Sequence, residues 1–240
     1  MTASVPAQPP VPPPPWAAEL ARHFETLIPR PALRRVPPSD GSARPAAVLI
    51  LLAEGPAGPD VLLIERAPDL RSHAGQPAFP GGATDPEDGS PVETALREAT
   101  EEVGLDPASV EVLASAPRLY LPPSNFMVTP VLAWWRRPGP VAPVDPAETA
   151  AVVRVPVADL ADPANRLSCV ALRGWVGPAF EVRGLFVWGF TAGLLDALLR
   201  AGGWERPWNA RRSVPAPVTT RGGPVGELSE AAIDEAGETL

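Results

Sequence analysis

Three glutamates in one short segment are the residues of this chain best suited to hold a metal ion. Glu98, Glu101 and Glu102 follow one another at spacings of three residues and one residue. On an α-helix these spacings bring the carboxylates to one side, because residues three and four apart are neighbours on the helix surface. Carboxylates this close repel each other, and a hard divalent cation such as Mg²⁺ or Mn²⁺, which prefers oxygen ligands, removes that cost. The spacing therefore predicts a metal site with Glu98 and Glu102 as the main ligands and Glu101 as the third.

The segment that carries these glutamates has the start and stop signals of an α-helix. Ser90 is a suitable N-cap, Pro91 suits the first turn, and Glu93 completes an S-x-x-E capping box. Gly104 stands where a residue of left-handed conformation ends a helix. A helix over residues 90–103 would also turn one apolar side toward a core, made of Val92, Ala95, Leu96, Ala99 and Val103.

An acidic helix face can also be merely solvated, so the residues around it decide between the two interpretations. Between residues 85 and 102 there are seven acids and one base, Arg97. Upstream stands the pair Gly81-Gly82, where missing side chains would let a ligand approach the backbone. An EF-hand calcium loop is excluded, because its spacing needs an acid five residues before Gly89, and Thr84 stands there. A catalytic metal site fits this segment better than either alternative.

The composition excludes several other kinds of chemistry. All 20 basic residues are arginine, so the chain has neither the phosphate-binding lysine of a P-loop nor a lysine for a Schiff base. Any phosphate must then be bound by arginine, backbone amides or a metal. A net charge of −8 disfavours a nucleic acid as partner. The single cysteine, Cys169, excludes an intramolecular disulfide.

The distribution of apolar residues predicts a cytoplasmic protein with no membrane partner. The longest apolar stretches fall far short of the roughly 20 residues that cross a bilayer. The N-terminus lacks the basic start of a signal peptide, and prolines interrupt its apolar residues.

Proline divides the chain of 240 residues into three expected parts. Twelve of the 35 prolines lie in residues 1–45, which we expect to be a flexible N-terminal segment with a short helix over residues 16–28. Residues 46–204 are expected to form the folded domain. Residues 205–240 are rich in proline, glycine and charge, and we expect a disordered C-terminal tail.

The middle part alternates short β-branched runs with turn signals, which predicts an α/β (α+β) fold with a mixed sheet flanked by two or three helices. Helices are expected over residues 90–103 and 189–201. One residue of the pair Trp134-Trp135 is expected in the core and the other on the surface. The expected strands cover residues 48–52, 61–64, 110–113, 127–135, 151–157, 169–172 and 180–187.

Residues 97–105, Arg-Glu-Ala-Thr-Glu-Glu-Val-Gly-Leu, resemble the second half of the Nudix box, R-E-U-x-E-E-x-G-U, in which U is aliphatic or small and apolar. The first half of the box departs from the pattern. Counting back from Arg97 puts Gly89 where a glutamate is expected, whereas counting forward from Gly82 puts Asp88 there. Whether Glu87 or Asp88 takes the place of that glutamate is left open.

A longer match is similar to one branch of this family. Residues 62–82, LLIERAPDLRSHAGQPAFPGG, resemble the signature L-L-T-x-R-[SA]-x3-R-x3-G-x3-F-P-G-G of coenzyme A pyrophosphatases, with Ile64 in place of threonine. The resemblance covers roughly residues 45–202. It implies a Nudix-type α/β/α sandwich with a mixed sheet and a catalytic loop-helix-loop.

The resemblance also implies a reaction. It is the Mg²⁺- or Mn²⁺-dependent hydrolysis of the diphosphate bond of coenzyme A or acyl-CoA, giving adenosine 3′,5′-bisphosphate and a 4′-phosphopantetheine. A metal held by the glutamates would neutralise the phosphate charge and activate a water. The catalytic candidates are Glu98, Glu101, Glu102 and Arg97, of which Arg97 is expected to orient the glutamates. The candidates for binding the substrate are Arg66, Arg71, His73, Gly81 and Gly82.

Two alternatives remain open from the sequence. The first is a Nudix pyrophosphatase for ADP-ribose, a dinucleotide or a nucleoside triphosphate, which would use the same metal ligands. The second is a catalytically silent binding module whose proline-rich N-terminal arm recruits partner proteins. The oligomeric state is also open, with a homodimer as one option, and so is the identity of the general base.

Overall fold

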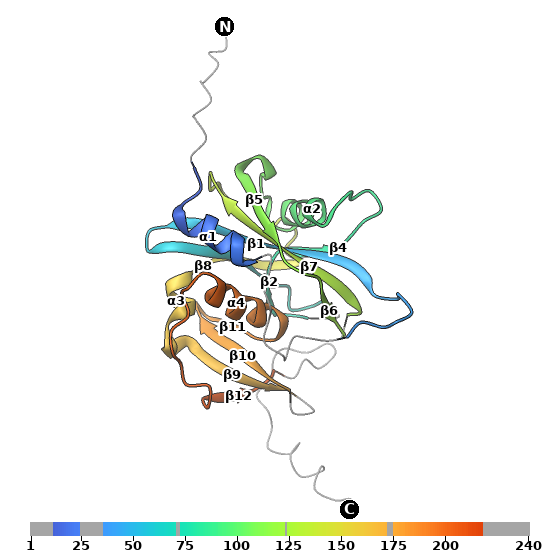
Figure 1. Ribbon diagram of the computed structural model, residues 1–240. Helices are drawn as coiled ribbons and strands as arrows, with labels where there is room; N and C mark the ends of the chain where they lie inside the picture. The colour runs from blue at the N-terminus through green and yellow to red at the C-terminus, as the bar shows by residue number, and fades with distance from the viewer. Residues whose placement is uncertain (1–11, 25–35, 71–72, 123, 172–174, 218–240) are drawn as a thin grey trace, which may run out of the picture.

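Two β-sheets, with helices between and outside them, make up the fold in a computed structural model (Figure 1). The structure describes residues 12–24, 36–70, 73–122, 124–171 and 175–217. In these residues the smaller sheet has four strands, β9 (Arg166–Ala171), β10 (Trp175–Val182), β11 (Leu185–Val187) and β12 (Ser213–Pro215). The larger sheet has eight, β1 (Arg44–Gly55), β2 (Gly58–Arg66), β3 (Pro77–Ala78), β4 (Gly81–Ala83), β5 (Val110–Ser115), β6 (Leu119–Leu121), β7 (Phe126–Trp135) and β8 (Thr149–Pro156).

The larger sheet is mixed. Its strands follow the order β3-β2-β1-β7-β5, while β4 pairs with β1, β6 with β7 and β8 with β2. The two long central strands β1 and β7 are parallel, and the other pairs of this sheet are antiparallel. The central strands are buried on both faces, which explains why their sequences are nearly continuous runs of apolar residues.

Helices cover both faces of the larger sheet. Helix α2 (Pro91–Val103) packs on one face against alternate residues of β1, among them Ala47, Leu49 and Leu51. The opposite alternation, with Ile50 and Leu52, faces the core that contains the other three helices, α1 (Pro15–Phe24), α3 (Val157–Ala161) and α4 (Gly189–Ala201). Figure 1 shows α4 lying between the two sheets. This layering positions α2 and its glutamates on the outer side of the larger sheet.

The predicted fold class is confirmed, and so are the two helices expected in the middle of the chain. Helix α2 follows Ser90 and ends at Val103, and α4 covers Gly189–Ala201. A second sheet was not anticipated. The expected strand over residues 180–187 is a hairpin, because Arg183 and Gly184 adopt positive φ values of 53° and 77° and reverse the chain. Across the described residues, no helix is long and apolar enough to cross a membrane.

The expectation for the tryptophan pair is wrong. Trp134 and Trp135 are both 3% exposed. They point to opposite faces of β7, and each face of that strand is covered by packed apolar side chains. The Trp135 indole donates a hydrogen bond to Ser109 Oγ at 2.9 Å. A central strand between two cores has no surface side, which the local sequence does not reveal.

The expected domain boundaries are both displaced by packing. On the N-terminal side, α1 inserts Leu20 and Phe24 into the main core, where both are fully buried. On the C-terminal side, residues 205–217 pack on the domain instead of belonging to a disordered tail, since β12 pairs with β9. The predictions of flexible termini also refer to residues 1–11, 25–35 and 218–240. These residues lie outside the described part of the chain.

The thiol of Cys169 is expected to be unreactive in the native protein. Cys169 is fully buried in β9, and burial raises the pKa of its thiol to about 11. Only the thiolate reacts quickly with disulfide reagents. We expect negligible reaction with a chromogenic aromatic disulfide at pH 8 in native buffer and reaction of one thiol per chain in concentrated urea. Rapid labelling without denaturant would contradict this burial.

Candidate active site

Helix α2 is fixed at both ends by the residues that predicted it. The Glu93 backbone N–H donates to Ser90 Oγ at 3.2 Å, and the Glu93 carboxylate in turn accepts from the Gly89 N–H at 2.9 Å. Gly104 has a φ of 68° and its N–H returns to the helix carbonyls, which ends the helix in a left-handed residue. The glutamates therefore project from a rigid, capped helix.

A glycine strand lies directly against the glutamates. Strand β4 pairs with β1, and the Gly81 N–H donates to Glu102 Oε2 at 3.0 Å. A Cβ atom on Gly82 would lie 2.4 Å from Glu98 Oε1. A Cβ on Gly81, whose φ is 155°, would lie 2.3 Å from the backbone oxygen of Ala47. The backbone of β1 thus requires glycine at position 81, whereas a side chain at position 82 would displace the Glu98 carboxylate.

The three glutamates are not equivalent. The side chain of Glu102 is 9% exposed and that of Glu98 is 18% exposed, whereas that of Glu101 is 58% exposed. Glu98 and Glu102 face β4, while Glu101 Oε2 accepts from Arg97 Nη1 at 2.9 Å. The helix therefore brings two carboxylates to the glycine strand and turns the third toward solvent.

Arg97 ties the helix to the loop that precedes it. Its Nη2 donates to the Ala83 carbonyl oxygen and to Asp88 Oδ2, both at 3.0 Å, and lies 3.1 Å from Glu98 Oε1. Its Nε donates to Asp88 Oδ1 at 3.1 Å. Arg97 thus contacts the carboxylates and the backbone around the site, an arrangement suited to orienting Glu98 rather than to contacting a substrate.

Of the two candidates for the missing glutamate of the Nudix box, Asp88 and Glu87, Asp88 is the one that contacts Arg97. The Asp88 side chain is 6% exposed and bonds to Arg97, which holds the pKa of Asp88 down at about 2. Glu87 is exposed. The loop contains one residue more than the usual pattern, and its Asp88 lies against Arg97. Asp88 therefore anchors an arginine and is not placed among the carboxylates at β4.

Burial makes the two carboxylates at β4 costly to charge. Desolvation raises the pKa of Glu102 to about 7, against the opposing effect of the Gly81 N–H bond. Desolvation also raises the pKa of Glu98. Glu98 has the Arg97 guanidinium at 3.1 Å, whereas buried Glu102 has only the more distant Arg66 guanidinium at 3.9 Å. A divalent cation would supply further positive charge.

The oxygen donors of Glu98 and Glu102 fit Mg²⁺ or Mn²⁺, which bind preferentially to carboxylates. In the described parts of the chain no three acidic, histidine or cysteine side chains are arranged as a complete ligand set. Mg²⁺ is commonly held by one or two carboxylates together with substrate phosphates and water. The donor set present here fits that mode of binding.

The side chains expected to bind substrate do not all lie at the site. Arg66, at the end of β2, places Nη1 3.9 Å from Glu102 Oε1, so it lies at the site. His73 adopts a positive φ of 57° in an exposed turn, where its Nδ1 lies 2.9 Å from Gln76 Oε1. Arg71 lies outside the described residues. Of the three, only Arg66 is seen to contact the carboxylates.

Thr149, which the sequence did not single out, also lies beside this site. Glu148 and Thr149 precede and begin β8, and Thr149 stands opposite Arg66 in the sheet. Thr149 is 1% exposed. Nothing within the local sequence marks Thr149, because it lies far from Arg66 along the chain and only the pairing of β8 with β2 brings the two together.

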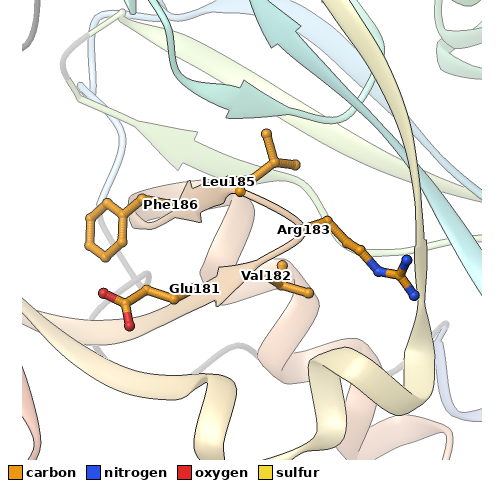
Figure 2. A pocket seen from close by; sticks show the side chains of 6 residues that line it. Glu181, Val182, Arg183, Leu185 and Phe186 are labelled. Carbon is orange, nitrogen blue, oxygen red and sulfur yellow. The ribbon is translucent and has the colours of Figure 1, made fainter.

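Two surface hollows lie away from α2 and β4. One, of about 310 Å³, is lined by the β10–β11 hairpin, residues 181–186, and Figure 2 shows Arg183 directed away from Phe186. The charged residues of that hairpin are engaged in ion pairs, Arg183 with Asp159 and Glu181 with Arg212. A second hollow lies at residues 205–208. Neither hollow adjoins Glu98 and Glu102, so α2 and β4 form the candidate active site.

The chain matches the NUDIX domain family over residues 43–169. A capped helix with two half-buried glutamates against a glycine strand, in a mixed α/β sandwich, agrees with this match. The chain therefore belongs to the Nudix hydrolase family, whose members hydrolyse diphosphate compounds.

Relatives within the family carry the description "Uncharacterized Nudix hydrolase NudL". The protein of Klebsiella pneumoniae is 36% identical over 195 residues, which cover 73% of this chain and 88% of the relative. The protein of Pectobacterium atrosepticum is 50% identical over 109 residues, which cover 45% of this chain and 53% of the relative. The crystal structure of the Nudix hydrolase RenU from M. smegmatis matches with a TM-score of 0.50 and 24% identity, covering 72% of this chain and 97% of that one. That match shows a shared fold.

Proposed function

We propose that this Nudix hydrolase cleaves the diphosphate bond of coenzyme A or of an acyl-CoA. The observation that carries the proposal is the place of residues 62–82, which resemble the coenzyme A pyrophosphatase signature. They form β2, β3 and β4 and supply Arg66 and the Gly81-Gly82 pair to the wall of the site. The residues of the signature are thus the ones that a diphosphate would meet beside Glu98 and Glu102.

The residues of this chain can perform distinct parts of the reaction. When bound by Glu98 and Glu102, a divalent cation would neutralise the charge of the diphosphate and lower the pKa of a water molecule. Arg66, with a side chain 30% exposed beside Glu102, would bind a phosphate oxygen. Arg97 and Asp88 keep the helix and its loop in register. The Gly81 N–H holds Glu102 in position.

Product analysis tests the choice of substrate. The purified protein with Mn²⁺ is expected to release adenosine 3′,5′-bisphosphate from coenzyme A at a higher kcat/KM than AMP from ADP-ribose. Separation of the products by chromatography checks this, with dinucleotides and nucleoside triphosphates in the same panel. A preference for ADP-ribose, a dinucleotide or a triphosphate would replace coenzyme A as the substrate, and no hydrolysis at all would favour a binding module.

A further inference from the structure

The backbone of Arg66 is held on both sides of its strand. Its N–H donates to the Gln76 carbonyl oxygen at 3.2 Å, and its own carbonyl oxygen accepts the Gly75 N–H at 3.1 Å. On the other side, the N–H of the next residue, Ala67, donates to the Glu148 carbonyl oxygen at 2.9 Å. The main chain is therefore fixed, and whatever holds the guanidinium decides where the Arg66 side chain points.

The two ends of the Arg66 guanidinium have different surroundings. Nη1 lies 3.9 Å from Glu102 Oε1, which is too long for a hydrogen bond, and the side chain is 30% exposed. Of the three guanidinium nitrogens, only Nε is buried without a hydrogen-bond partner within the described chain. Buried donors normally have a partner. The terminal nitrogens are thus open to a phosphate, whereas Nε needs a partner from the protein.

Thr149 carries a second buried polar atom without a partner, directly beside Arg66. The residue is 1% exposed, and its Oγ1 has no hydrogen bond to any described residue. Thr149 on β8 and Arg66 on β2 are paired positions of the sheet. Side chains of directly paired residues share a face, with Cβ atoms about 4.5–5.5 Å apart. A hydroxyl oxygen can accept an N–H, so the two unpartnered atoms complement each other.

A β-bulge brings the threonine to this position. Glu65 pairs with Ala151, but the next residue, Arg66, pairs with Thr149, so that Ala150 is an extra residue in β8. Without the extra residue, Ala150 would stand opposite Arg66. Bulges re-aim side chains, and they are common next to active sites. The irregular pairing therefore supplies a hydroxyl group where regular pairing would supply a methyl group.

The other neighbours of Arg66 are already engaged. On the β3 side of the strand stands Gln76, whose Oε1 lies 2.9 Å from His73 Nδ1. Glu102 faces the terminal Nη1 and is a proposed metal ligand. Among these described neighbours, Thr149 is the one whose side chain is left to hold Nε.

We infer that Thr149 is a positioning residue that holds Arg66 for binding a phosphate group of the substrate. When a diphosphate is bound, the Thr149 hydroxyl oxygen accepts the Arg66 Nε–H, and this hydrogen bond directs the two Nη groups to the phosphate oxygens. An arginine held in this way loses less side-chain freedom on binding, so the phosphate is bound more tightly. This role rests on the proposed function for the presence of a diphosphate beside Glu98 and Glu102.

Thr149→Val tests this role, because valine keeps the shape of threonine and removes the hydroxyl group. The probe is imidodiphosphate, a diphosphate analogue that resists hydrolysis, titrated by calorimetry in the presence of Mn²⁺. Its Kd is expected to rise about tenfold, as for the loss of one hydrogen bond to a charged group. In steady-state kinetics the loss is expected in KM rather than in kcat. Thr149→Ser keeps the hydroxyl group and is expected to bind the probe as tightly as the wild type.

A double variant separates positioning from direct contact with the ligand. Arg66→Met removes the guanidinium and is expected to weaken binding of the probe more than Thr149→Val does. If Thr149 acts through Arg66, adding Thr149→Val to Arg66→Met causes no further loss. A further loss in the double variant would overturn the inference and make Thr149 a direct ligand. Wild-type affinity in Thr149→Val would overturn it as well.

Thr191→Val is the matched control, since Thr191 is a buried threonine of α4, which packs on the opposite face of the larger sheet. It is expected to keep the wild-type Kd and KM. The KM is measured with whichever diphosphate the wild type hydrolyses best. A substrate other than coenzyme A would therefore refute the proposed function and leave the role of Thr149 standing, whereas a wild type that does not bind the probe would overturn both.

Discussion

Glu102→Gln is expected to lower kcat by about 10³-fold while leaving the fold intact. A metal ion contributes several kcal/mol to the stabilisation of a charged transition state, and about 1.4 kcal/mol corresponds to a factor of ten. Glutamine keeps the size and the carbonyl oxygen of the side chain but loses the charge that holds the cation. Steady-state kinetics with Mn²⁺ measures the loss, and calorimetry is expected to show weaker binding of Mn²⁺.

The stability of the same variant separates a metal ligand from a structural carboxylate. Glu102 is 9% exposed, and its burial raises its pKa to about 7, so its charge is costly in the protein without metal. A neutral amide removes that cost and can still accept the Gly81 N–H. The thermal midpoint without metal is therefore expected to be equal to that of the wild type or higher.

Glu111→Gln on β5, remote from α2, serves as the control and is expected to have wild-type activity and stability. Wild-type turnover by Glu102→Gln would show that Glu102 is not a ligand. A large fall in the thermal midpoint of Glu102→Gln would instead mean that Glu102 stabilises the fold.

Asp196→Ala is expected to reduce the free energy of unfolding by about 3–5 kcal/mol, because it leaves a buried charge without its main partner. Arg166 on β9 and Asp196 on α4 form an ion pair, and both side chains are 0% exposed. The Arg166 guanidinium also lies 5.4 Å from the Phe180 ring and 4.6 Å from the Trp208 ring. Burial lowers the pKa of Arg166, which shows how poorly this position solvates a charge without Asp196.

Two further variants show whether the lost stability comes from the buried, unpaired charge of Arg166. Asp159→Ala removes the exposed pair with Arg183 and is expected to cost about 1 kcal/mol or less, since solvent weakens such pairs. Adding Arg166→Met to Asp196→Ala removes the stranded charge, and we expect it to recover much of the lost stability. Urea unfolding measures all three proteins. A cost below 1 kcal/mol for Asp196→Ala would mean that the guanidinium finds another partner.

The buried ion pair of Arg166 and Asp196 also explains why residue 205 is too early a start for the expected disordered tail. Glu205 Oε1 lies 3.4 Å from Arg166 Nη1, and the Trp208 ring covers the same guanidinium. Residues 205–217 have no regular apolar pattern, which is why their sequence predicted disorder. The side-chain partners of Glu205, Trp208 and Arg212 lie more than 30 residues away, in β9 and β10. Long-range contacts of this kind leave no local signal.

The sequence by itself determined the helix that carries the glutamates. Ser90 and Gly104 cap it, and its apolar side is spaced for burial, so every signal lies within a few residues of the structure it specifies. The resemblance to the Nudix box over residues 97–105 and the expected mixed sheet rest on equally local patterns. Helix α4 was predicted in the same way and has the predicted ends.

Only the tertiary structure decided how these parts work together. It buried Glu102 and left Glu101 exposed, joined Asp88 to Arg97, and brought Thr149 opposite Arg66 through the pairing of β8 with β2. Spacing along a helix says which residues share a side, but burial and charge depend on what packs against that side. That information is spread over strands far apart in the chain, and folding alone combines it.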